Sequence, residues 1–159
     1  GPRVALRAEL LEEVDELALL LRHDGGDDLV ARALGQLHQL IGDLLHGLPL
    51  DADLVFDVRF LPNPYYIPEL KALTGLDEPV RNFIFQYQQT KDFLEKTEDL
   101  LAFLLPNYVD EGKTDLVIAV GCTGGQHRSS CIAKELCDFI SKRGYVANLT
   151  HRDMSRNRG

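Results

Sequence analysis

The fold is decided by residues 116–129, which read LVIAVGCTGGQHRS. The first five of these residues form a continuous apolar run, which is typical of a strand buried on both faces of a parallel sheet. A glycine pair follows, and beyond it apolar residues recur at helical spacing: Ile132, Leu136, Phe139 and Ile140. The pattern predicts a strand, a tight loop and a helix over 126–143 that Gly144 closes.

The sequence on either side of this stretch alternates between strand and helix signals. Residues 54–60 (LVFDVRF) alternate as a strand does, and residues 61–64 (LPNP) predict the turn that ends it. Helical spacing predicts a short helix around 80–87 and a longer one that stops at Pro106. Residues 145–150 predict a last strand. This order indicates an α/β fold, a small layered domain with a mostly parallel sheet over residues 49–159.

Residues 1–50 differ in composition from the rest of the chain. They contain no Lys, Ser, Thr, Asn, Phe, Tyr or Cys, and all of these types appear from residue 51 onward. Leucines and valines at 4-3-4 spacing predict two helices joined by a turn at residues 23–28 (HDGGDD). We therefore expect residues 1–48 to be an α-helical hairpin, an oligomerisation or fusion segment that precedes the domain.

The apolar stripe of the expected hairpin is wider than one partner helix would cover. Pairing of two hairpins into a four-helix bundle would cover it, and would make the protein a homo-oligomer. Packing of the hairpin against the following domain is the alternative, and the sequence leaves both open.

Charge and cysteine content restrict the class of protein. The chain carries a net charge of −8, but residues 113–159 hold eight basic against four acidic residues, so a local field could still attract an anion. The three cysteines are an odd number without metal-ligand spacing, and no apolar stretch is long enough to span a membrane. We expect a reduced, cytoplasmic protein that uses neither a metal nor a cofactor and does not contact a membrane.

The loop at 121–129 has the composition of an anion-binding site. Glycines allow backbone amides to turn inward, and the start of the helix adds free N–H groups and the positive end of its dipole. The loop also offers hydroxyl and cationic donors. The residues that we expect to bind a phosphate here are Cys122, Thr123, Gly124, Gly125, His127, Arg128 and Ser129.

Several motifs appear together over about 110 residues. They are residues 51–64 (DADLVFDVRFLPNP), 73–77 (LTGLD), the loop 121–129 and residues 150–153 (THRD). In this order they resemble the C-terminal domain of the RNase adapter RapZ/YvcJ family. The resemblance implies a domain that binds small regulatory RNA, presents it to an endoribonuclease and senses an amino-sugar phosphate. It also implies that Asp57 joins the loop in the ligand site.

Two further expectations follow from the resemblance. Members of the family start with a kinase-like P-loop domain, but no G-x-x-x-x-G-K-[ST] occurs in this sequence, so hydrolysis of ATP or GTP is not expected. The RNA phosphates would meet the basic residues near the C-terminus: Lys142, Arg152, Arg156 and Arg158.

A second interpretation of the same loop is catalytic. Cys122, Gly125, Arg128 and Ser129 satisfy C-x-x-G-x-x-R-[ST], the phosphate loop of cysteine-dependent phosphatases. Cys122 would then be the nucleophile, Arg128 would hold the phosphate oxygens, and Ser129 would assist departure of the thiolate. Gly121 stands where a His commonly precedes the nucleophile, and no general acid is identifiable. Both points weigh against catalysis, and the length of the family resemblance favours binding.

Overall fold

The computed structural model describes residues 3–10, 52–123 and 126–151, in which four strands form one parallel sheet. The strands are β1 (Arg3–Leu10), β2 (Leu54–Asp57), β3 (Asp115–Cys122) and β4 (Val146–His151). The helices described with them are η1 (Pro64–Tyr66), α3 (Glu78–Phe85), α4 (Gln88–Glu111) and α5 (Arg128–Lys142). The sheet order is β2-β3-β1-β4. The predicted α/β layered fold with a parallel sheet is confirmed.

Strand β3 lies inside the sheet, with β2 on one side and β1 on the other. Ile118, Ala119 and Val120 are completely buried, so consecutive residues on both faces of the strand are withdrawn from water. This explains why the sequence shows a continuous apolar run here instead of an alternation.

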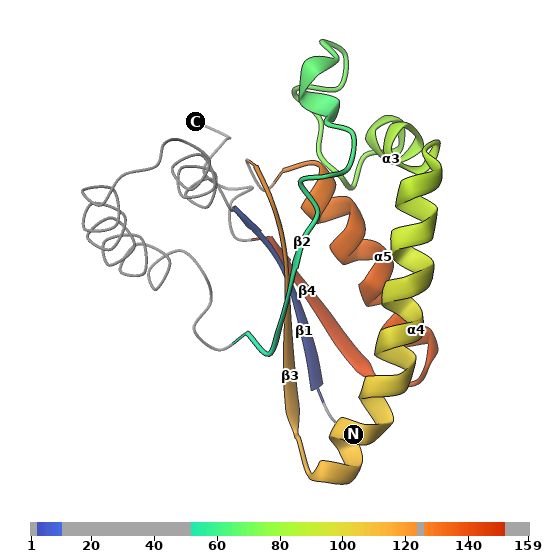
Figure 1. Ribbon diagram of the computed structural model, residues 1–159. Coiled ribbons are helices and arrows are strands. Elements are labelled where there is room, and N and C mark those ends of the chain that lie inside the picture. The colour runs from blue at the N-terminus through green and yellow to red at the C-terminus, as the bar shows by residue number, and fades with distance from the viewer. Residues whose placement is uncertain (1–2, 11–51, 124–125, 152–159) are drawn as a thin grey trace, which may run out of the picture.

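Helices α3, α4 and α5 lie on the same face of the sheet (Figure 1). The buried face of α5 consists of residues at helical spacing, among them Ile132, Leu136 and Ile140. Leu101 and Leu105 of α4 are buried in the same core. Removal of this apolar surface from water is the main stabilisation of such a layer, at about 25 cal/mol per Å².

Strand β1 corrects one expectation from the sequence. Residues 1–48 were expected to form a helical hairpin, but Arg3–Leu10 is a strand between β3 and β4. The signal for it is in the sequence, because Val4, Leu6, Ala8 and Leu10 recur with the period of two that a strand requires. The rest of the expected hairpin and the boundary at residue 49 lie outside the described residues.

Helix α4 corrects a second expectation from the sequence. The sequence predicted that it stops at Pro106, but it continues to Glu111 and ends at Gly112, whose φ is 101°. A proline inside a helix disturbs the carbonyls of the preceding turn. The side-chain amide of Asn107 donates to one of them, Phe103 O, at 2.7 Å. Although α4 has 24 residues, no helix of the described ranges is apolar enough over its length to cross a membrane.

Because all four strands are parallel, their carboxyl ends meet at one edge of the sheet (Figure 1). The β3–α5 loop and residues 58–75, which follow β2, lie at this edge. Ligands of open α/β sheets bind outside the carboxyl ends of the strands. We therefore expect the candidate site at this edge of the sheet.

Candidate functional site

The pairing of β2 with β3 brings Asp57 to the start of the β3–α5 loop. Asp57 lies opposite Gly121 in the register, and the next residue, Val58, donates its N–H to Gly121 O at 2.9 Å. The predicted proximity of Asp57 and this loop, which are more than 60 residues apart in the sequence, is therefore observed.

Asp57 forms an ion pair with Arg59, which stands two residues further on the same strand end. The Arg59 guanidinium donates from Nη2 to Oδ2 at 2.6 Å and from Nε to both carboxylate oxygens at 3.0 Å. Partial burial would raise the pKa of Asp57, but the hydrogen bonds from Arg59 and the charges of Arg59 and Arg128 outweigh it and hold the pKa below its ordinary value. Asp57 is therefore a carboxylate at neutral pH, able to accept a hydrogen bond from a hydroxyl or an amine.

Arg128, the first residue of α5, is only 4% exposed. Its Nη1 donates to the carbonyl oxygens of Arg59 at 2.5 Å and Leu61 at 3.0 Å. Its Nε is buried and has no hydrogen-bond partner among the described residues. Arg128 thus holds the segment after β2 in place, and one of its donors remains for a further acceptor.

His127 and Gln126 bind the next part of the same segment. His127 is 6% exposed, and its ring Nε2 lies 3.2 Å from Leu70 O. Burial lowers the pKa of His127 although nearby backbone carbonyls favour the protonated ring, so the imidazole is neutral at neutral pH. Gln126 donates from Nε2 to Leu73 O at 2.6 Å.

Gly75 packs against residues 126–131, and no chemical property of a glycine marked it as a site residue. It donates its N–H to Gln126 O at 2.9 Å. A Cβ on Gly75 would stand 2.1 Å from His127 O and 2.5 Å from Cys131 N, closer than any side-chain atom can approach. A glycine is therefore required, and its only signal in the sequence was its place in the motif LTGLD at residues 73–77.

Cys122 and Ser129 face each other across the loop. The Cys122 thiol donates to Ser129 Oγ at 3.1 Å, and Ser129 N–H lies 3.4 Å from the sulfur. Both residues are completely buried. The sulfur is therefore placed to stabilise the loop from within, and a phosphate ester in solution does not reach it without a rearrangement.

The structure does not bring all of the remaining residues of the predicted site together. Thr123 is exposed within the loop, while Gly124 and Gly125 lie outside the described residues. Lys142 is exposed at the other end of α5, which at 1.5 Å per residue is about 21 Å from Arg128. Arg152, Arg156 and Arg158 also lie outside the described residues. His151, at the carboxyl end of β4, has a buried Nδ1 without a hydrogen-bond partner among the described residues.

The side chains of this edge are suited to an anion more than to a metal ion. In the described ranges no group of three His, Cys, Asp or Glu residues gathers as metal ligands would. The polar groups at this edge include the buried Arg128 Nε, which has no hydrogen-bond partner among the described residues, and the exposed Thr123, and both residue types are phosphate ligands.

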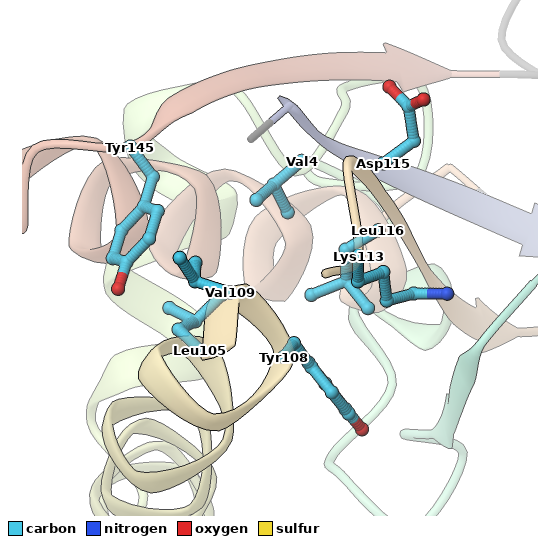
Figure 2. Close-up of a pocket in the computed structure, with 8 residues that line it drawn as sticks. All are labelled: Val4, Leu105, Tyr108, Val109, Lys113, Asp115, Leu116 and Tyr145. Atoms are coloured by element: carbon cyan, nitrogen blue, oxygen red, sulfur yellow. The ribbon is translucent and has the colours of Figure 1, made fainter. Parts of the chain in front are cut away.

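A pocket at the opposite end of the sheet is too small to be the ligand site. Figure 2 shows it between the end of α4 and the beginnings of β1 and β3, with Tyr145 at its side. Its volume is about 10 Å³, the space of about one water molecule. A sugar phosphate does not fit there.

Comparison with known proteins identifies the family. Residues 43–155 match the family described as the RapZ C-terminal domain. The chain belongs to this family. The family match includes Asp57, the loop 121–129 and the segment 58–75 that α5 holds in place.

Relatives of this RapZ C-terminal domain are proteins named "nucleotide-binding protein". One from Caldicellulosiruptor saccharolyticus is 55% identical over 112 residues, which cover 70% of this chain and 38% of that protein. One from Clostridium acetobutylicum is 51% identical over 70% of this chain and 38% of that protein. One from Bacillus cytotoxicus is 55% identical over 72% of this chain and 39% of that protein. The chain therefore spans about two fifths of the length of these relatives.

Proposed function

We propose that this chain is an RNA-binding adapter domain that senses a phosphorylated amino sugar at the edge formed by β2, β3 and α5. The observation that carries the proposal is membership of the RapZ C-terminal domain family over residues 43–155, a range that includes the entire edge. The family points to an adapter kind of role for RNA. The choice of small regulatory RNA and of an amino-sugar phosphate goes beyond the family match.

The geometry of the edge supports a phosphate ligand. Arg128 Nε is buried and has no described partner, so a phosphate oxygen beside it would form a charge-assisted hydrogen bond. The Thr123 hydroxyl and backbone N–H groups of the β3–α5 loop would hold the other oxygens, with Gly124 and Gly125 permitting a close approach. Asp57 is held as a carboxylate by Arg59 and would accept from a sugar hydroxyl or the amine.

The RNA would contact a wider surface than the sugar phosphate. Lys142 lies about 21 Å from the loop along α5, so the two contacts would belong to different phosphates of a structured RNA. Arg152, Arg156 and Arg158 would add contacts from the C-terminal residues. Because the whole chain is acidic, binding by one copy would be weak. A homo-oligomer would increase it by avidity, and an endoribonuclease would be the partner to which the RNA is presented.

The cysteine-dependent phosphatase is the second candidate, because Cys122 and Ser129 lie 3.1 Å apart as that chemistry requires. The complete burial of the Cys122 thiol and the engagement of Arg128 Nη1 by two carbonyls place binding ahead of catalysis.

Two assays on one preparation test the proposal. Filter binding of a structured small RNA should show an affinity that falls about tenfold or more between low and physiological salt, as expected when several phosphates are contacted. Calorimetry should detect a hexosamine phosphate. Lys142→Ala should reduce the salt dependence, whereas Lys113→Ala, which removes a lysine paired with Asp53, is the charge-matched control and should not. Turnover of an aryl phosphate that is lost in Cys122→Ser, without salt-dependent RNA binding, would replace the adapter with the phosphatase.

A further inference from the structure

Two tyrosines stand exposed at the same edge, on the segment that α5 holds in place. Tyr66 is 81% exposed and Tyr65 is 49% exposed. Their rings meet edge to face, with centroids 5.9 Å apart and planes at 82°. Neither ring belongs to the hydrophobic core. Exposure of two adjacent aromatic rings leaves apolar surface in water, and the core packing gives no reason for it.

The backbone under these rings is rigid. Three prolines occur within residues 62–68 (PNPYYIP), and each fixes its own φ. Asn63 caps η1 by accepting from Tyr65 N at 3.2 Å, and Ile67 N donates to Pro64 O at 3.0 Å. On either side of η1 the segment is held through Leu61 by Arg128 and through Leu70 by His127. The rings are thus preorganised, which lowers the entropic cost of stacking a ligand on them.

The charge around the rings suits a polyanion. The ammonium of Lys71 lies over the Tyr65 ring, 4.6 Å from its centroid. Residues 58–75 contain Arg59 and Lys71 against Glu69, a net charge of +1 in a chain whose net charge is −8. A cation beside an open aromatic face is the combination with which proteins hold unpaired nucleotides, the ring for the base and the cation for the phosphate.

We propose that Tyr66, with Tyr65 and Lys71, forms a stacking platform for unpaired bases of RNA. The inference rests on the proposed RNA-binding function and specifies the part of the RNA that this edge takes, a single-stranded segment or loop. A base stacks on the open face of Tyr66, while Lys71 contacts an adjacent phosphate. The platform and the β3–α5 loop lie at the same edge, so the RNA follows the carboxyl ends of the strands (Figure 1).

The test compares the whole chain with three variants on two RNA probes. The probes are an unstructured oligonucleotide and a blunt, fully paired duplex of the same length, each followed by fluorescence anisotropy over a range of salt. Tyr66→Ala should weaken binding of the single strand on the order of tenfold, the range for loss of one stacked base. Its salt dependence should not change, because no charge is lost. Duplex binding should stay as in the parent chain, and Phe103→Ala, which removes a 66% exposed ring from α4, should alter neither.

The third variant reports stacking directly. The chain has no tryptophan, so Tyr66→Trp introduces a single fluorophore at the platform. Its affinity should match that of the parent, and its emission should be quenched by the single strand but not by the duplex. Tyr66 is exposed, so all variants should fold, which thermal unfolding checks.

Each contrary outcome has a distinct meaning. If the parent binds RNA with the expected salt dependence but Tyr66→Ala binds the single strand as well as the parent does, the platform is refuted and the adapter function stands. If no RNA binds even at low salt, the proposed function fails first. If Tyr66→Trp emission changes on dilution without RNA, a second copy of the chain covers the rings and the nucleotide assignment is overturned.

Discussion

Arg128 and Leu61, 67 residues apart in the sequence, are joined by a 3.0 Å hydrogen bond from the guanidinium Nη1 to the carbonyl oxygen. The same nitrogen donates to Arg59 O. Arg128, which the sequence predicted to bind a ligand, therefore also fixes the backbone that carries Arg59 and leads to the stacking platform of Tyr65 and Tyr66. Loss of its side chain affects both the ligand and the fold.

Arg128→Ala should destabilise the protein and weaken phosphate binding together. Two backbone carbonyls that accept from a buried cation would lose their partner, which costs about 2–4 kcal/mol of unfolding free energy. Affinity for a hexosamine phosphate should fall about tenfold or more. Urea unfolding and calorimetry measure the two effects. The control is Arg143→Ala, which removes an exposed arginine after the other end of α5; it should leave binding unchanged and cost at most about 1 kcal/mol, the range for its cation–π contact with Phe139. An Arg128→Ala protein of unchanged stability would contradict the clamp.

Gly75→Ala should be among the most destabilising single-methyl substitutions in the chain. The added Cβ would lie 2.1 Å from a backbone oxygen, so α5 or residues 73–77 must move, at about 2 kcal/mol or more. Gly112→Ala serves as the comparison, because its site is open and only its φ of 101° opposes the substitution. We expect that change to cost about 1 kcal/mol. Chemical denaturation measures the loss of unfolding free energy in both variants. A larger loss in Gly112→Ala than in Gly75→Ala would contradict the close contact of Gly75 with His127 O.

Protonation of His127 should destabilise the fold. Because burial lowers the pKa of His127 in the folded state, the unfolded chain binds the proton more readily. Stability should therefore be complete above the ordinary histidine pKa, near 6.5, and should decrease as the pH falls from there toward the folded value. The melting temperature should drop more between pH 7.5 and 5.5 in the parent chain than in His127→Gln, which keeps a side-chain nitrogen near Leu70 O but does not titrate. His151, whose pKa burial also lowers, is present in both proteins and cancels in the comparison. Equal drops would exclude His127 as the source.

The cysteine thiols should be protected in the native protein. Cys122, Cys131 and Cys137 are all buried, and burial raises the pKa of Cys131 to about 12. Little access slows the reaction of all three with a disulfide reagent such as Ellman's reagent, and at Cys131 a smaller thiolate fraction slows it further. Titration should find little reaction in the folded state and all three thiols after denaturation. Fast labelling of Cys122 in the folded chain would instead favour the phosphatase.

The strand, loop and helix over residues 115–142 could be predicted because their signals are local. An apolar run that is buried on both faces and a helical face of Ile132, Leu136 and Ile140 are each visible in a short window. Strand β1 was not predicted, because the leucines that follow it at helical spacing dominated the interpretation of the first residues. Helix α4 continues past Pro106 because Leu105, just before the proline, is buried in the core and the side-chain amide of Asn107, just after it, donates to Phe103 O.

The composition of the candidate site could be predicted, but the roles of its members could not. Sequence identified His127 and Arg128 as cationic ligands of the loop. The structure shows that both are buried and bonded to carbonyls of residues 59, 61 and 70. Those partners are 57 to 69 residues away in the sequence, and no spacing rule connects a side chain with a backbone carbonyl at such a distance.

The order β2-β3-β1-β4 has a consequence for how the chain reaches its fold. Within this sheet β1 pairs with β3 and β4 but not with β2, the strand that follows it in the sequence, and β2 pairs only with β3, which comes more than 50 residues later. During synthesis, β1 and β2 therefore leave the ribosome without the hydrogen-bonding neighbours that they have in the finished sheet. Loop-closure entropy must be overcome before those pairings form, which makes such topologies slow to fold and exposes unpaired strands in the meantime. The ligand site is completed only when β3 and the start of α5 have both emerged, so nascent-chain ligand binding should begin after residue 129 and not before.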